Sequence, residues 1–174
     1  MSRQASSPAL PIAHAVLRIL IVLNWLSGVV IATMLFAPLT RRWIMRALEL
    51  SPSPEADRVI LGLRAIAAIG LAAIPLHFVV LQRLLAIVET VRAGDPFVAA
   101  NALRLRAIAW TLLSLQLLSL VVAALVRAVS TPAHPVHIHS GFSIGGWVAV
   151  LLSFLLARVF AEGTLMREDL EGTV

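Results

Sequence analysis

Ala107–Val126 reads AIAWTLLSLQLLSLVVAALV, twenty consecutive residues without Arg, Lys, Asp or Glu. A helix rises about 1.5 Å per residue, so about 20 apolar residues cross the ~30 Å hydrocarbon core of a bilayer. Three more charge-free runs of 18 or 19 residues share this character: Ile19–Ala37, Ala65–Gln82 and Ser140–Ala157. We therefore predict an all-α, polytopic membrane protein: one domain over residues 1–174, a four-helix bundle with transmembrane helices at about 16–37, 59–82, 106–128 and 141–161.

The composition favours the same class of protein. Hydrophobic residues make up 60% of the 174 residues and charged residues 13%, against about 45–50% and 25% in soluble domains. All fourteen cationic side chains are Arg, and most lie at the ends of the apolar runs, where snorkelling and lipid headgroups explain them. The net charge of +5 is therefore not a nucleic-acid signal. The absence of cysteine excludes disulfides, thiolate metal sites and cysteine nucleophiles.

The connections between the apolar runs carry helix signals of their own. Residues 40–50 place apolar side chains on one helical face and charged ones on the other, which predicts an amphipathic helix in the headgroup layer. Ser53 and Pro54 have the order of an N-cap and a first helical residue. Gly94 would end that second long helix, and Asp95 and Pro96 would begin the third. Because both helices are longer than a bilayer requires, we predict a helical hairpin that extends beyond the membrane.

Four crossings place both termini and the hairpin on one side of the membrane. That side holds eight arginines, and the opposite side holds six. Under the positive-inside rule, this distribution favours cytoplasmic N- and C-termini and a cytoplasmic hairpin.

Two segments resemble the signature regions of domain-of-unknown-function family 2975. They are GDPFVAANALRLR at the hairpin turn and VFAEGTLMREDLEGTV at the C-terminus. The matching positions are Gly94, Pro96, Phe97, Asn101, Leu105 and Arg106 in the first segment and Phe160, Gly163, Arg167 and Glu168 in the second. The resemblance covers most of the chain and implies a small, multi-pass protein of the bacterial inner membrane. It also implies a cytoplasmic hairpin and tail, and a frequent gene neighbour that encodes a helix-turn-helix regulator. It implies no known reaction.

Our leading functional hypothesis is an interaction or regulatory module rather than an enzyme. The hairpin and the C-terminal tail would pack on each other and present a surface to a cytoplasmic partner, such as a helix-turn-helix regulator. We expect these polar side chains to be exposed there: Asp95, Asn101, Arg104, Arg106, Arg167, Glu168 and Asp169. The lipid bilayer is the other expected partner, and self-association into a homo-oligomer stays open. We expect no cofactor and no direct contact with nucleic acid.

Polar residues inside the spans support a first alternative. Asn24, His77 and Gln116 would line the pathway of a small oligomeric channel or transporter, or they would only hydrogen-bond neighbouring helices. Arg64 and Arg127 lie near the ends of their spans, where they would snorkel outward or attract an anionic headgroup. No Asp or Glu lies within the four runs, which counts against a proton- or cation-coupled transporter.

The segment before the fourth span supports a second alternative. His134, His137 and His139 fall within six residues, and imidazoles this close could ligate Zn²⁺, Cu²⁺ or Ni²⁺; otherwise the segment is a proline-stiffened connector. Residues 141–145 match the G-x-S-x-G nucleophile pattern around Ser143, but the strand that this pattern requires is missing. The same spacing of small residues lets membrane helices approach closely, so we interpret it as a packing motif.

Overall fold

The computed structural model describes residues 9–36, 40–47, 53–130 and 141–171. Its long helices are α1 (Ala9–Phe36), α3 (Pro54–Arg92), α4 (Ala99–Val129) and α5 (Ile144–Glu171), and its short helix is α2 (Thr40–Ala47). Each long helix is long and apolar enough to cross a membrane. The predicted all-α class with four candidate spans is confirmed, and α2 falls within the predicted amphipathic segment.

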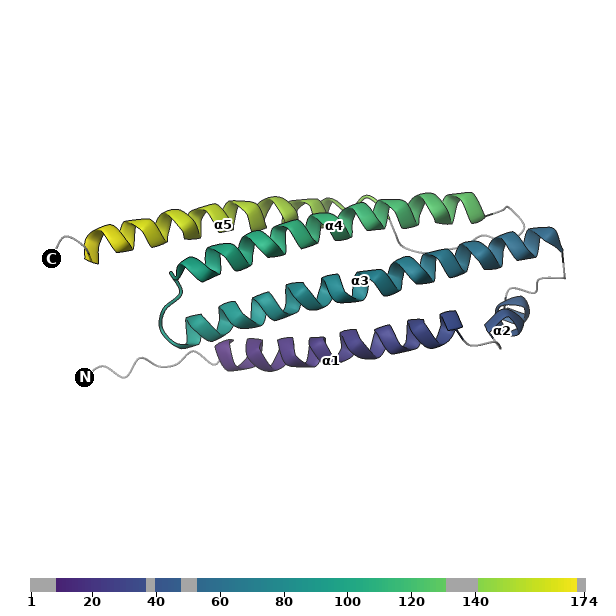
Figure 1. The fold of residues 1–174 in the computed structure, drawn as a ribbon, viewed down its shortest axis with the longest axis horizontal. Helices are drawn as coiled ribbons and strands as arrows, with labels where there is room; N and C mark the ends of the chain where they lie inside the picture. Colours follow the sequence, from purple (N-terminus) through teal and green to yellow (C-terminus); the bar gives the residue numbers. More distant parts are fainter. Residues whose placement is uncertain (1–8, 37–39, 48–52, 131–140, 172–174) are drawn as a thin grey trace.

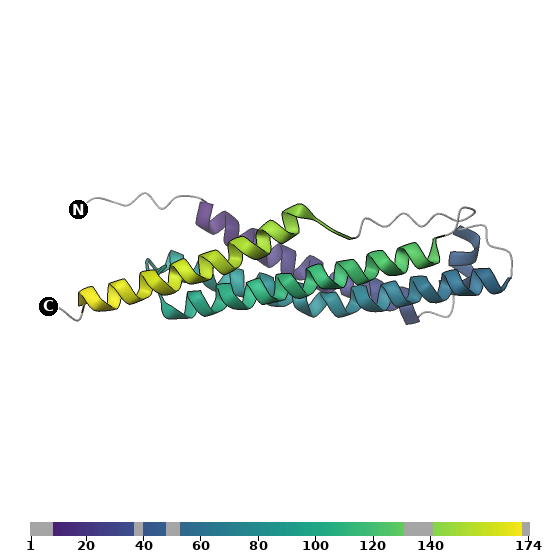
Figure 2. The ribbon, with the colours of Figure 1, turned by 90° about the horizontal axis from the view of Figure 1, so that it is seen from above.

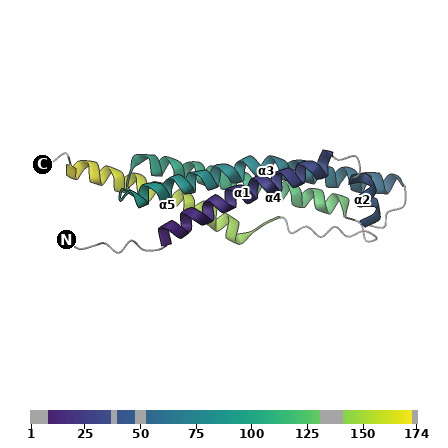
Figure 3. The ribbon, with the colours of Figure 1, turned by 90° about the horizontal axis from the view of Figure 1, so that it is seen from below.

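The long helices lie in a single row in the order α1, α3, α4, α5 (Figure 1). In the described part of the chain, α3 contacts α1 and α4, α5 contacts α4, and α1 and α5 do not meet. From above and from below, α1 runs obliquely to α3 (Figures 2 and 3). The expected four-helix bundle is therefore an open row. Neighbouring helices of the row pack on each other, but nothing drives apolar side chains away from lipid to close the row.

The start of α1, the α3–α4 turn and the end of α5 lie together at one end of the row (Figure 1). We call this the hairpin end: residues 9–14, 83–106 and 158–171. The opposite end, formed by residues 40–47, 53–64 and 124–130, is the loop end. α3 has 39 residues, which gives a length of about 58 Å, nearly twice the ~30 Å hydrocarbon core. One helix therefore reaches well beyond a bilayer.

The two ends of α3 follow the predicted local signals. The Ser53 side chain accepts a hydrogen bond from the amide of Ala56 at 3.1 Å, and Pro54 is the first helical residue. After the helix ends, Gly94 has φ +86°, a left-handed conformation that glycine adopts without steric cost. The predicted N-cap and the predicted glycine stop are both confirmed.

The predicted start of the third long helix is wrong. α4 begins at Ala99, and Val98 precedes it without a side-chain cap. Asp95 does not cap this helix; its carboxylate instead pairs with the guanidinium of Arg167, which lies 72 residues away. Asp is a common N-cap, but here its carboxylate is engaged by a guanidinium of another helix.

Ser143 has a structural role at the start of α5. Its hydroxyl accepts a hydrogen bond from the amide of Gly146 at 3.2 Å, as an N-cap does. Gly141, with φ +124°, exchanges two hydrogen bonds with Ser119 of α4: its amide donates at 3.0 Å and its carbonyl accepts at 3.2 Å. This segment therefore caps α5 and holds its start against α4 through Gly141. Gly145 has no atom within 4 Å of its Cβ position, so the predicted packing applies to only one of the two glycines of the motif.

Candidate functional site

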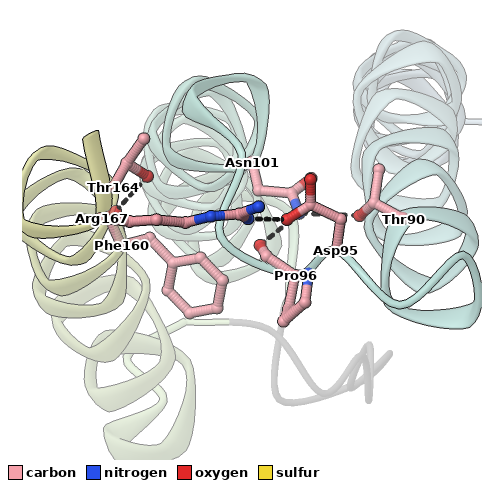
Figure 4. Close-up of polar contacts among 7 residues, drawn as sticks. All are labelled: Thr90, Asp95, Pro96, Asn101, Phe160, Thr164 and Arg167. Carbon is pink, nitrogen blue, oxygen red and sulfur yellow. Dashed lines mark hydrogen bonds and ion pairs between the residues drawn. The ribbon is translucent and has the colours of Figure 1, made fainter. Parts of the chain in front are cut away.

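The two motif segments meet at the hairpin end (Figure 4). The rings of Phe97 and Phe160 lie with their centroids 5.3 Å apart. A Cβ added to Gly163 would lie 3.2 Å from the Phe97 ring, so the absence of a side chain there lets the ring approach α5. Arg167 of α5 pairs with Asp95 of the turn. An aromatic contact and an ion pair therefore join the C-terminal part of α5 to the hairpin.

Asn101 is the polar centre of the hairpin. It is fully buried, with 0% of its surface exposed. Its side-chain amide donates hydrogen bonds to the Thr90 hydroxyl at 2.7 Å and to the Pro96 carbonyl at 2.8 Å (Figure 4). Its carbonyl oxygen accepts from the Arg104 guanidinium at 2.8 Å. One side chain thus connects the last turns of α3, the connecting turn and the first turns of α4.

This arrangement corrects the expectation that Asn101 and Arg104 are exposed to a partner. Asn101 and Leu105 are buried, and Arg104 is half-buried with a second hydrogen bond to the Ala86 carbonyl at 3.3 Å. The physical reason is helical spacing, because Asn101, Leu105 and Ile108 follow the i, i+4, i+7 pattern of one face, and α3 covers that face. These residues hold the hairpin together and are not available to a partner.

The remaining residues expected at this surface differ in accessibility. Arg106 and Arg167 are exposed, and Asp95 is half-buried beside Arg167. Glu168 and Asp169 belong to α5, but their side chains lie outside the described part of the structure. The polar surface that a partner could contact is therefore smaller than the sequence suggested.

An open apolar groove of about 330 Å³ lies between the start of α4 and the end of α5. Leu103 and Leu165 are 67% and 60% exposed beside it. The lining residues are Ala99, Ala102, Leu103, Ala161, Thr164 and Leu165. Sequence reasoning missed this groove, although small residues three apart on both helices were a visible signal. A pair of helices with small residues facing each other in this way leaves room for side chains from a third.

The groove lies outside the charge-free runs of α4 and α5. On α4 the charge-free run begins after Arg106, and the groove residues precede it. On α5 the run ends at Ala157, and the exposed Arg158 and Glu162 follow, joined by an ion pair of 2.9 Å. Charged groups are costly inside hydrocarbon, so this position is the one expected of a groove on the aqueous side of the spans.

The polar residues of the spans do not come together. Asn24 of α1 donates to the Ile74 carbonyl of α3 at 3.1 Å. The Nδ1 atom of His77 lies 2.8 Å from a carbonyl oxygen of its own helix. Gln116 of α4 lies against Gly146 of α5, where a Cβ would overlap the carboxamide. They occupy the α1–α3 interface, the exposed surface of α3 and the α4–α5 interface, so within one chain they line no common pathway.

The three histidines predicted as metal ligands lie in a segment that the structure does not describe. His134, His137 and His139 fall in residues 131–140, which the structure does not describe. Among the described residues, no three His, Asp or Glu side chains gather as metal ligands would.

Arg64, which was expected near the end of its span, is exposed at the loop end.

A family model described as protein of unknown function (DUF2975) matches residues 15–174. No curated protein and no solved structure matches the chain. The matched range includes both segments that meet at the hairpin end and all four candidate spans apart from the first residues of α1. The similarity therefore concerns the whole architecture.

Proposed function

The chain belongs to the DUF2975 family of proteins of unknown function, and we propose that it is a multi-pass membrane protein whose hairpin end docks an amphipathic helix of a cytoplasmic partner protein. The single observation that carries this proposal is the open apolar groove between α4 and α5, on the aqueous side of the charged boundary. We infer a role in binding rather than in catalysis; the hydrogen bond by which the serine of the nucleophile-like pattern caps a helix supports this inference.

The groove has the character of a helix-docking site. Leu103 and Leu165 expose most of their surface where no hydrocarbon would cover them. Exposed apolar patches outside lipid mark protein contacts in soluble proteins, and a groove between two helices accepts the apolar ridge of a third. Burying one leucine side chain contributes about 1.5–3 kcal/mol, so two leucines can supply a substantial part of a micromolar affinity of about 8 kcal/mol.

Charge beside the groove favours an acidic partner segment. Arg106 follows Leu103 by three residues, so both side chains lie on the same side of α4. It is exposed and has no hydrogen bond or ion pair with any described residue. A carboxylate on the docking helix would pair with this guanidinium and fix the register of the helix. Arg158 already forms an ion pair with Glu162, so we do not expect it to pair with the docking helix.

The distribution of arginine supports a cytoplasmic hairpin end. Eight arginines accompany the hairpin and both termini, and the positive-inside rule then favours the cytoplasm. In a bacterial inner membrane, the groove would face cytoplasmic proteins. The resemblance to a family often encoded beside helix-turn-helix regulators suggests such a regulator as the partner, an association that carries no structural weight by itself.

Co-purification with the regulator encoded beside the gene tests this proposal. The intact protein in detergent is compared with Leu103→Gln, with Leu165→Gln and with Met166→Gln as the control. Met166 is 62% exposed on the same helix, next to Leu165, but does not line the groove. We expect the two groove variants to capture the regulator at least about tenfold more weakly, since each loses about 1.5 kcal/mol or more of burial. Equal capture by all four proteins, or no capture by the intact protein, contradicts the proposal.

A further inference from the structure

A second cavity, which we call the polar pocket, lies on α3 where the charge-free run of that helix ends. It has a volume of about 330 Å³, at the lower end of the range of about 300–1,000 Å³ in which proteins bind small molecules. Four of its residues follow the i, i+3, i+4, i+7 spacing of one helical face, so α3 forms its floor. The lining residues are Gln82, Arg83, Leu85, Ala86 and Glu89 of α3 and Arg104 of α4.

Two guanidinium groups line this pocket with donors that remain available. The Nη1 atom of Arg104 donates to the Ala86 carbonyl at 3.3 Å and to the Asn101 side chain at 2.8 Å, which holds the side chain across α3. A guanidinium has five N–H donors, and those on Nε and Nη2 of Arg104 have no acceptor among the described residues. Arg83 is exposed and has no acceptor in the described part of the chain either.

Glu89 brings a negative charge to the same pocket. Within the described residues, no ion pair joins its carboxylate to Arg83 or Arg104. The Nε2 atom of His14 on α1 lies 3.6 Å from the carboxylate Oε1, beyond the usual hydrogen-bond range of about 2.7–3.2 Å. The Glu89 side chain is 54% exposed. Opposite charges thus border one space without pairing across it, so a ligand that carries both charges can bridge them.

The position of the pocket along the helices indicates the source of such a ligand. On α3, Gln82 is the last residue of the charge-free run, and Arg83 is the first charged residue after it. On α4, Arg104 lies three residues before the run that begins at Ala107. Both guanidinium groups therefore fall where the headgroups of a bilayer crossed by these runs would lie.

The charges of the pocket match one kind of headgroup better than others. A phosphodiester oxygen accepts hydrogen bonds from guanidinium groups, and a primary ammonium donates to a carboxylate. Ethanolamine carries such an ammonium two carbons away from the phosphate. Choline has no N–H to donate, and no aromatic ring lines the pocket to bind its quaternary ammonium instead. A glycerol headgroup leaves the carboxylate without a cation.

We propose that the polar pocket binds a phosphoethanolamine group, and that its source is the headgroup of phosphatidylethanolamine. Arg83 and Arg104 bind the phosphodiester, and Glu89 binds the ammonium. The acyl chains run along the charge-free part of α3 that precedes Gln82. The soluble compound glycerophosphoethanolamine offers the same two charges but lacks this apolar contact. The polar pocket shares no residue with the groove between α4 and α5, so either site can fail its test without the other.

Native mass spectrometry of the detergent-solubilised protein tests the site with three lipids that have identical acyl chains. They are phosphatidylethanolamine, phosphatidylglycerol and phosphatidylcholine. The variants are Arg83→Gln and Glu89→Gln, because Arg104 also supports Asn101 and its substitution could open the hairpin. Arg92→Gln is the control for the first variant, since Arg92 is exposed on the same helix but does not line the pocket. Glu162→Gln is the control for the second, since Glu162 is 59% exposed on α5.

We expect the intact protein to bind phosphatidylethanolamine more tightly than phosphatidylcholine. Arg83→Gln should lower the affinity for phosphatidylethanolamine and phosphatidylglycerol alike, by about fivefold, as for an interfacial arginine. Glu89→Gln should lower the affinity for phosphatidylethanolamine by about threefold, as for a partly exposed charge pair, and should not lower the affinity for phosphatidylglycerol. This change in headgroup preference is a readout that a general loss of structure would not produce. Both control variants should stay within about twofold of the intact protein.

Each outcome decides for or against the proposal. Loss of the preference for phosphatidylethanolamine in Glu89→Gln, with full retention in both controls, supports it. Equal binding of phosphatidylethanolamine and phosphatidylcholine by the intact protein overturns it, and so does a parallel loss of phosphatidylethanolamine and phosphatidylglycerol in Glu89→Gln. Glycerophosphoethanolamine is added as a competitor, and displacement of the lipid at an equimolar concentration would overturn the lipid as the source of the group. Circular dichroism of every variant establishes that the helices are intact.

Discussion

Replacing Asn101 by alanine is expected to open the hairpin without unfolding the membrane spans. The substitution removes two hydrogen bonds that Asn101 donates and one that it accepts from Arg104. A neutral hydrogen bond contributes about 1 kcal/mol and one to a charged group about 1.5–3 kcal/mol, so the loss is about 3.5–5 kcal/mol. Because 1.4 kcal/mol corresponds to about a factor of ten, the open hairpin should become at least about 300-fold more populated.

Hydrogen–deuterium exchange measured by mass spectrometry in detergent micelles reports this opening. The relevant amides include that of Asp95, which donates to the Thr90 carbonyl at 3.1 Å, and that of Asn101, which donates to the Val98 carbonyl at 2.8 Å. Peptides covering residues 90–106 should exchange much faster in the variant, while peptides from residues 66–80 should not change. Local opening has this signature because the hairpin and the spans are separate cooperative units.

Two further variants test whether the hydrogen bonds of Asn101 are what stabilises the hairpin. Leu103→Ala changes an exposed side chain two residues away and should leave exchange in the hairpin unchanged. Asn101→Asp keeps an acceptor for Arg104 and loses both donors, so it should fall between the intact protein and the alanine variant. If the hairpin peptides of Asn101→Ala exchange within about threefold of the intact protein, the buried network does not stabilise the hairpin.

Three further substitutions test the packing and the helix ends, each measured as a change in unfolding free energy in mixed micelles. Gly62→Ala should destabilise the protein by about 1–3 kcal/mol through overpacking against Val129. Gly145→Ala is the control and should not destabilise it, because no atom lies within 4 Å of the added Cβ. Equal effects of the two substitutions contradict the register of α3 and α4. Gly94→Ala should cost about 1–2 kcal/mol, because an alanine is strained at a left-handed φ, and a neutral result would exclude that conformation. Ser53→Ala should cost about 1 kcal/mol by removing the N-cap of α3; an unchanged free energy would mean that the cap is not formed.

Local signals in the sequence predicted helix ends where the partner of each end is also local. Ser53 and Gly94 act within their own turns, and both predictions are confirmed. The prediction for Asp95 was wrong because its partner, Arg167, lies on another helix, and capping rules contain no information about distant ions. The same limit applies to the whole arrangement, since four apolar helices can close into a bundle or stay in a row with the same hydropathy pattern.

The inward orientation of Asn101 could have been predicted from the sequence. It shares a helical face with Leu105 and Ile108, and a polar residue on an apolar face of this kind usually bonds within the protein. The groove was harder to predict, because it depends on how the start of α4 and the end of α5 pair. No periodicity within one helix reports the distance between two helices that are joined by a long connection.

The hairpin end therefore divides into residues that hold it and residues that a partner could contact. Asn101 is buried, and Phe97, although 44% exposed, contacts Phe160 and lies against Gly163. Substitution of these residues should therefore disturb hairpin exchange and partner capture together. Leu103 and Leu165 face the groove and are mostly exposed, so their substitution should disturb partner capture alone. A variant at Leu103 that loses partner and exchange protection in parallel would mean that the groove is part of the support of the hairpin, and the docking surface would then have to lie elsewhere.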